Sequence, residues 1–179
     1  MKTKSVILAA LLSTLSGCTP PKTIPFSTAT EFDSAKAKAM LGEGENSLRG
    51  SAVMRKSDGG VVTCAGTEVR LIPSTAYTDE RMLALYGNIE AGFNPAYWGE
   101  KRLKVKKEIA EYHQIFKQTT CDAQGFFKFN NLEDGSFYVF STMTWEVGSG
   151  IQIRTIDGGT LMKRVTLKGG ESKEIILTP

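Results

Sequence analysis

The sequence predicts a mainly β protein, an antiparallel β-sandwich of about seven or eight strands with one or two short helices. Two observations lead to this prediction. Many short stretches alternate apolar and polar residues, as strands with one buried face do. The chain also has 18 glycines but only 6 prolines, which fits many tight turns. The expected strands are residues 47–55, 61–64, 67–72, 112–120, 125–130, 136–144, 151–156, 160–167 and 172–178.

The strongest strand signals lie between residues 125 and 144. Asp122 and Gly125 bracket one turn, and Asp134-Gly135 is typical of a tight hairpin turn. The apolar residues of the two strands alternate, so we expect these four in the core: Phe127, Phe129, Phe137 and Val139.

The strand over residues 47–55 is expected to bury one face, made of Leu48, Gly50, Ala52 and Met54. Near the C-terminus, Asp157-Gly158-Gly159 predicts a second hairpin, between residues 151–156 and 160–167.

Two segments show helical features. Thr30 and Asp33 fit a capping box for a helix over residues 30–41, which Gly42 would end. Thr78 is the expected cap of a second short helix, which Gly87 would end. Its apolar face is made of Met82, Leu85, Tyr86 and Ile89.

Residues 92–107 give the least regular pattern and predict a loop with large apolar anchors. The segment that follows can be interpreted in two ways. Val105, Ile109, Tyr112 and Phe116 would line a helix, whereas Tyr112, Gln114 and Phe116 would alternate along a strand. We favour a strand over residues 112–120, because the chain enters the next turn extended.

The N-terminus carries targeting features. Lys2 and Lys4 precede a short apolar run over residues 6–12. The sequence from Leu15 to Cys18 resembles a bacterial lipobox; an ordinary secretory signal with an incidental cysteine is the alternative. The resemblance implies cleavage before Cys18 and a lipid on its thiol, and Thr19 then favours the outer membrane, facing the periplasm.

These features predict three parts of the chain: a signal peptide (1–17), a lipidated tether with a short helix (18–46) and a β-sandwich (47–179). Removing residues 1–17 takes away two lysines and no acid, so the net charge of +3 falls to +1. A nearly neutral mature chain gives no reason to expect a nucleic-acid partner.

With Cys18 acylated, Cys64 and Cys121 remain. An even number of cysteines in an oxidising compartment predicts one disulfide, and two buried free thiols are the alternative. Two cysteines and His113 cannot supply a usual zinc ligand set, so no metal is expected.

Two parts of the sequence resemble the transthyretin-like (prealbumin-like) β-sandwich, and in particular the carboxypeptidase regulatory-like domains. The first part is Leu48–Val53 followed by Gly66–Pro73. The second is Asp122–Phe129 with Leu132, Gly135 and Phe137–Val139. Residues 74–118 depart from the family pattern as an insertion. The resemblance implies a binding or accessory module with no shared chemistry and no cofactor.

The sequence carries no clear catalytic signature. His113 is the single histidine, and its neighbours form no known signature. Glu146 stands where the Val147–Gly150 segment would need a glycine to form a nucleophile elbow. We therefore predict a non-catalytic binding or assembly module; a small envelope hydrolase, or its accessory subunit, is the alternative.

One surface is a candidate for binding an envelope glycan, an anionic lipid or a protein partner. It combines a cluster of positive charge with a nearby tryptophan: Trp98, Lys101, Arg102, Lys104, Lys106 and Lys107. A solvated, partly ion-paired edge is the alternative, since Glu100 and Glu108 flank the cluster. Phe93, Tyr97 and Trp98, with Trp145 elsewhere in the sequence, could likewise form a partner or carbohydrate surface; a role in the core or in anchoring a loop is the alternative.

Overall fold

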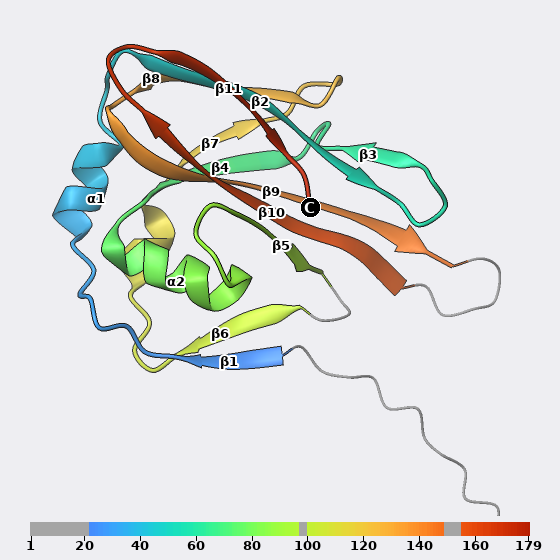
Figure 1. Cartoon of the computed structure of the whole chain (residues 1–179), viewed down its shortest axis with the longest axis horizontal. Coiled ribbons are helices and arrows are strands. Elements are labelled where there is room, and N and C mark those ends of the chain that lie inside the picture. The colour runs from blue at the N-terminus through green and yellow to red at the C-terminus, as the bar shows by residue number, and fades with distance from the viewer. Residues whose placement is uncertain (1–21, 97–99, 149–154) are drawn as a thin grey trace, which may run out of the picture.

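The computed structural model describes residues 22–96, 100–148 and 155–179, and it confirms the predicted β-sandwich (Figure 1). Two sheets pack face to face. Their strands are β2 (Asn46–Arg55), β3 (Val61–Thr63), β4 (Glu68–Pro73), β5 (Ala91–Pro95), β7 (Lys117–Thr120), β8 (Phe126–Leu132), β9 (Gly135–Val147), β10 (Thr155–Leu167) and β11 (Ser172–Leu177). The two α-helices are α1 (Ser34–Met40) and α2 (Ala76–Tyr86).

The larger sheet has five strands in the order β5-β10-β9-β4-β7, all antiparallel. In the smaller sheet, β2 pairs with β11, with β8 along its first half and with β3 at its end. The β11–β2 pair is parallel, which the expectation of an antiparallel sandwich did not include.

The core lies between the two sheets and follows the predicted alternation. Leu48, Ala52 and Met54 on β2 are buried, and so are Phe127 and Phe129 on β8. The other sheet contributes Phe137 and Val139, both fully buried. Alternation fixes these faces because successive side chains of a strand point to opposite sides of its sheet.

The predicted pairing across Asp134-Gly135 is wrong, although the turn exists. β8 pairs with β2, whereas β9 pairs with β10 and β4, so this turn carries the chain from one sheet to the other. The turn at Asp122 also connects strands of different sheets, β7 and β8. There Asp122 Oδ1 accepts hydrogen bonds from the backbone N–H of Gln124 (3.0 Å) and of Phe126 (2.9 Å).

The hairpin predicted at Asp157-Gly158-Gly159 is also wrong, because β10 runs straight through these residues. A Cβ on Gly158 would lie 2.2 Å from the carbonyl oxygen of Met143 on the neighbouring strand. This glycine therefore permits a close approach of two strands rather than a turn. The first half of the predicted hairpin, residues 151–154, lies outside the described residues.

Both helices begin at a different cap from the one predicted. Asp33, not Thr30, caps α1, and its side chain accepts a hydrogen bond from the Lys36 N–H. Thr75, not Thr78, caps α2 in the same way, because its extended backbone aims the hydroxyl at the Thr78 N–H. Gly87 ends α2 in the left-handed conformation, as predicted.

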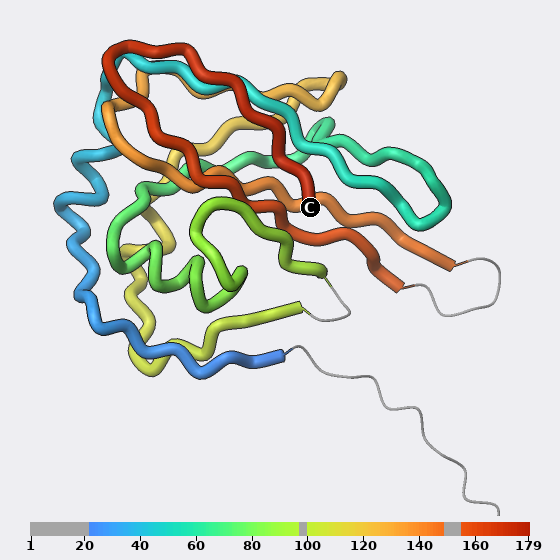
Figure 2. Tube along the Cα trace, viewed as in Figure 1, coloured from blue at the N-terminus to red at the C-terminus, as the bar shows by residue number. Residues whose placement is uncertain are grey.

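Helix α2, within residues 74–118, covers part of the outer face of the five-stranded sheet. Met82 on α2 packs against Tyr138 and Met162 of that sheet. The loop predicted over residues 92–107 instead contains β5 and β6 (Lys101–Val105), and β6 pairs in parallel with β1 (Lys22–Phe26) (Figure 2). The strand favoured over residues 112–120 is shortened to β7, and a 3₁₀ turn, η1 (Ala110–Gln114), precedes it.

The predicted disulfide between Cys64 and Cys121 is present. Cys64 follows β3 of the smaller sheet and Cys121 follows β7 of the larger one. Both residues are buried, with Cα atoms 5.7 Å apart. The bond therefore joins the two layers of the sandwich. Across the described ranges, no helix is long and apolar enough to cross a membrane.

Candidate functional site

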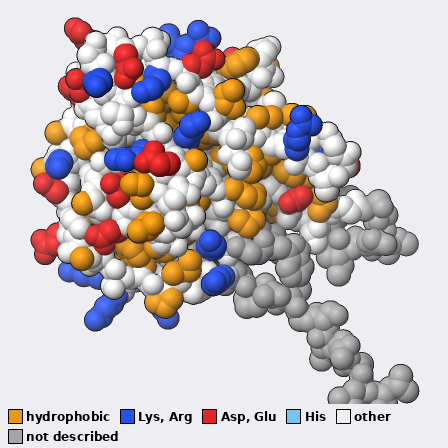
Figure 3. Space-filling view, in the orientation of Figure 1, with side chains coloured by type: hydrophobic (Ala, Val, Ile, Leu, Met, Phe, Trp, Pro, Cys, Tyr) orange, Lys and Arg blue, Asp and Glu red, His pale blue; other side chains and the backbone are white. Residues whose placement is uncertain are grey.

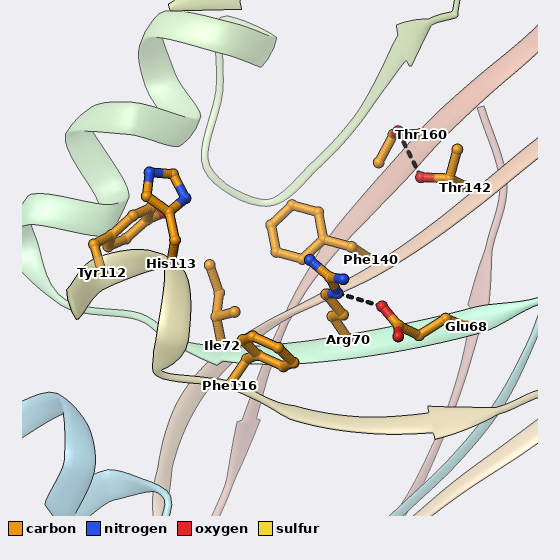
Figure 4. Close-up of a pocket in the computed structure, with 9 residues that line it drawn as sticks. All are labelled: Glu68, Arg70, Ile72, Tyr112, His113, Phe116, Phe140, Thr142 and Thr160. Carbon is orange, nitrogen blue, oxygen red and sulfur yellow. Dashed lines mark hydrogen bonds and ion pairs between the residues drawn. The ribbon is translucent and has the colours of Figure 1, made fainter. Parts of the chain in front are cut away.

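A groove of about 470 Å³ lies on the outer face of the five-stranded sheet (Figure 4). Strands β4, β9 and β10 form its floor, and η1 with the residue leading to β7 forms its wall. The residues that line it are Glu68, Arg70, Ile72, Tyr112, His113, Phe116, Phe140, Thr142 and Thr160.

Strand alternation places the floor residues on this face. Leu71 and Val139 point into the core and are fully buried. Their neighbours Arg70 and Phe140 therefore point outward, and they lie directly opposite each other across the β4–β9 pair. Helix α2 covers the adjoining part of the sheet, which leaves Phe140 half-buried at the end of the groove.

The apolar part of the groove consists of aromatic rings. The guanidinium carbon of Arg70 lies 4.7 Å from the centre of the Phe116 ring, within cation–π distance. In Figure 4, Arg70 projects between Phe116 and Phe140, so the three side chains make one continuous surface. Its planar faces are suited to stacking against a flat, weakly polar ligand.

The polar part consists of two side-chain pairs on the same floor. Arg70 Nε donates to Glu68 Oε1, and the terminal nitrogens of Arg70 have no hydrogen-bond partner within the described part of the chain. The hydroxyls of Thr142 and Thr160, on neighbouring strands, lie 2.8 Å apart. One of the two protons serves this bond, so the pair can still donate one hydrogen bond to a ligand.

The buried guanidinium of Arg81 stabilises the wall of the groove through its contacts with Tyr112 and Glu108. Arg81 of α2 is only 7% exposed, and its guanidinium lies 4.4 Å from the centre of the Tyr112 ring. It donates to the Tyr77 hydroxyl (3.0 Å) and to Glu108 Oε1 (3.1 Å). Burial raises the pKa of Tyr112 to about 12, so its hydroxyl stays protonated at neutral pH.

His113 lies at the rim of the groove, and its side chain is exposed. Its Nε2 lies 2.7 Å from Glu108 Oε1, the oxygen that also accepts from Arg81. Partial burial acts to raise the pKa of Glu108, but the hydrogen bond from His113 and the charge of Arg81 outweigh it and hold that pKa below its usual range. Glu108 is therefore a carboxylate near neutral pH.

The structure separates the predicted basic surface from the groove. Lys101, Arg102 and Lys104 lie on β6, and Lys106 and Lys107 follow it, whereas none of them lines the groove. Trp98 and Tyr97 lie outside the described residues. Phe93 lies on β5 and is 38% exposed. Within the described ranges, no three histidine, cysteine or acidic residues are placed to hold a metal.

Sequence reasoning did not predict the groove, since it considered His113 only as a catalytic candidate and set it aside. Arg70, Phe116 and the Thr142–Thr160 pair come from four separate segments, so no local motif contains them. The available signal was weak: outward-facing positions of β4 and β9 carry an arginine and a phenylalanine where small polar residues are expected.

Comparison with known proteins supports the fold. No protein-family model matches the chain, and no curated protein matches it. A solved structure from Pseudomonas aeruginosa, described as that of a "putative carbohydrate binding protein", is similar with a TM-score of 0.66 and 24% sequence identity. The similarity covers 84% of this chain and 99% of that one, so the two share a fold over almost their whole described length.

Proposed function

We propose that this chain is a lipid-anchored, non-catalytic protein of the bacterial cell envelope that binds a glycan in the groove on the five-stranded sheet. One observation carries the proposal: the groove places aromatic rings beside unused hydrogen-bonding groups in a single site. The description of the Pseudomonas aeruginosa structure as a carbohydrate-binding protein agrees with this chemistry.

A sugar ring fits such a surface because it has both weakly polar C–H faces and polar hydroxyl groups. Its C–H faces are weakly polar and can lie on Phe116 or Phe140. Its hydroxyls both donate and accept, which suits the terminal nitrogens of Arg70 and the Thr142–Thr160 pair. The volume of about 470 Å³ falls within the range of small-ligand pockets.

The charges around the groove favour an uncharged glycan. Glu68 is paired with Arg70, and Glu108 is paired with Arg81. Within each pair the negative and positive charges balance, so the groove has no large excess of charge of either sign. A neutral polyhydroxylated ligand loses less hydration energy there than a charged one does.

Binding without catalysis is the better interpretation of the acids near the groove. A general acid for glycoside hydrolysis needs a raised pKa, and the pKa of Glu108 is lowered instead. The carboxylate of Glu68 already accepts a hydrogen bond from Arg70. Both acids therefore support the shape and charge balance of the site, which weighs against the hydrolase alternative.

The location rests on the N-terminal sequence. The lipobox-like segment from Leu15 to Cys18 supports acylation of Cys18, and Thr19 supports an outer-membrane position facing the periplasm. The transthyretin-like resemblance of the two core segments is compatible with the sandwich seen here. The buried disulfide suits an oxidising compartment.

The test is glycan binding by the chain from Cys18 to Pro179, screened on immobilised envelope polysaccharides and measured by calorimetry. Phe116→Ala should weaken binding roughly tenfold, or about 1.4 kcal/mol. Phe126→Ala is the matched control, since Phe126 is an exposed phenylalanine (49%) on the other sheet. Equal affinity of the two variants, or no glycan bound by the wild type, would contradict the proposal.

A further inference from the structure

Lysines around β1 and β6 form a basic surface that the groove does not use. Arg102 is neutralised, because its Nε and Nη2 donate to the two carboxylate oxygens of Glu100 at 2.9 and 3.0 Å. The lysines, in contrast, have no ion pair or side-chain hydrogen bond with any described residue. This set, here called the lysine face, is Lys22, Lys101, Lys104, Lys106 and Lys107.

The β1–β6 pairing places Lys104 on the solvent side. Lys22 and Lys101 lie opposite each other at the start of the pair, on the side of the apolar residues, where Lys22 is exposed and Lys101 is half-buried. The strands run in parallel, and Ile24 and Phe26 lie opposite Leu103 and Val105. These apolar residues turn toward α2, where Arg81 lies 5.7 Å above the Phe26 ring. The alternate positions, with Lys104 among them, therefore point away from the protein. Figure 3 shows Lys and Arg side chains along the lower edge of the molecule, over these two strands.

The lysine face also lies close to the proposed lipid anchor. Lys22 comes four residues after Cys18 in the sequence, and it is paired with Lys101. Four residues span at most about 14 Å even when fully extended. Surface charges act over a Debye length of about 8–10 Å at physiological ionic strength. An anchored chain therefore keeps the lysine face within, or just beyond, the range of headgroup charge.

We propose that the lysine face lies against the anionic phospholipid headgroups of the membrane that holds Cys18. The proposal rests on the lipid anchor of the proposed function and adds a second, electrostatic contact beside it. Lysines spread along a strand and a turn suit a diffuse negative surface, because each is a compact point charge. Recognition of one defined phosphate would instead favour arginine, which binds in a bidentate manner.

The contact would fix how the domain is oriented on the membrane. A single flexible tether leaves a domain free to rotate, whereas a second contact on β1 and β6 holds one edge down. Two attachment signals are also what stable membrane binding generally requires.

Amine labelling tests the contact without depending on acylation in cells. The chain from Cys18 to Pro179 is coupled through Cys18 to a maleimide lipid, since Cys64 and Cys121 are joined to each other. It is then labelled with an amine-reactive reagent on vesicles of phosphatidylcholine, with or without phosphatidylglycerol. Mass spectrometry follows each lysine.

We expect the lysine face to react at least about fivefold more slowly on anionic vesicles than on neutral ones, a loss that high salt reverses. Three exposed lysines elsewhere serve as internal controls and should not change: Lys36, Lys128 and Lys168. Equal labelling of both sets on anionic vesicles would overturn the proposal. Protection by a soluble anionic polysaccharide, with none on vesicles, would overturn it as well and assign the face to a glycan.

A charge variant gives a second measurement. Replacing Lys101, Lys104 and Lys106 by glutamine should lower partitioning of the uncoupled chain onto anionic vesicles by roughly fivefold per lysine. The variant Lys36→Gln/Lys128→Gln/Lys168→Gln removes the same charge elsewhere and should bind as the wild type does. Equal loss in both variants would mean that only net charge matters. Neither readout uses the groove, so a failed glycan test leaves this result independent.

Discussion

Arg70 joins the aromatic and polar parts of the groove. Its guanidinium plane lies over Phe116, at 4.7 Å, while its Nε donates to Glu68. Only a planar cation with several donors can make both contacts and still offer nitrogens to a ligand. The residue lies on the exposed face of a strand, and the proposed function assigns it a role in binding.

Arg70→Lys tests this role, because it keeps the charge and removes the plane. Lysine cannot stack on Phe116 and donate to Glu68 at the same time, so glycan affinity should fall roughly tenfold. The melting temperature should stay within a few degrees, since exposed ion pairs contribute little to stability. Calorimetry and thermal unfolding measure the two effects. Arg49→Lys, an exposed position on β2, should leave affinity unchanged; an equal loss there would count against a specific role.

Glu108 predicts a dependence of stability on pH. Its pKa is lower in the folded chain than in the unfolded one, because His113 and Arg81 favour the carboxylate. Its contribution to stability is therefore present above the unfolded pKa and is lost as the pH falls through the folded pKa. We expect the free energy of unfolding to decline below about pH 4–5.

Glu108→Gln should be less stable than the wild type at pH 7 and should show a shallower decline in acid. Denaturant titrations at a series of pH values measure both effects. Glu111→Gln is the matched control, since Glu111 is exposed and has no ion pair with any described residue. Parallel stability curves for the wild type and Glu108→Gln would show that the Glu108–His113–Arg81 cluster does not contribute.

At the scale of elements, the two sheets are held together by core packing and by the disulfide. Cys64 and Cys121 are separated by 57 positions in the sequence, so the bond removes much freedom from the unfolded chain. Replacing both by alanine should lower the free energy of unfolding by about 4 kcal/mol. Urea titration of the double variant measures this directly. A loss below about 1 kcal/mol would mean that packing alone holds the layers together.

The sequence predicted turns and buried faces better than strand pairing. Asp134-Gly135 does reverse the chain, but a turn signal does not say whether the next strand joins the same sheet. The choice is made by distant partners, since β8 pairs with β2 and β9 with β10 and β4. The hairpin predicted at Gly158 was wrong for a related reason, because close strand approach and tight turns both favour glycine.

The strands within residues 92–107 could not be predicted from the sequence, because they depend on tertiary contacts. β6 pairs with β1, which lies far away in the sequence, and Asn94 fixes its start through two hydrogen bonds of 2.9 Å to the Lys101 backbone. Neither interaction leaves a local pattern. The groove was hidden in the same way, since it forms only when β4, β9, β10 and η1 come together.

At the scale of the whole molecule, the sandwich is a support for two surfaces with different chemistry. The groove on the five-stranded sheet is aromatic and charge-balanced. The lysine face on β1 and β6 is cationic, and it begins at Lys22, four residues after Cys18 in the sequence (Figure 3). This separation fits a protein that is held at a membrane by one side and binds a glycan with another.

Cys18→Ala tests the anchor. Loss of the acylated thiol should move the protein from the membrane fraction to the soluble fraction of lysed cells, because the lysine face alone binds weakly at physiological salt. Fractionation with immunodetection measures the change. Ser16→Ala leaves the cysteine in place and should remain in the membrane fraction. Membrane association of Cys18→Ala equal to that of the wild type would exclude lipidation.

Backbone amide NMR during glycan titration tests the central claim most directly. A glycan bound by the chain from Cys18 to Pro179 should shift the amide signals of Arg70, Phe116 and Thr142 together, with one dissociation constant. Signals of Arg49 and Phe126, on the other sheet, should stay in place. Shifts confined to the smaller sheet, or none at saturating glycan, would contradict the assignment of the groove as the binding site.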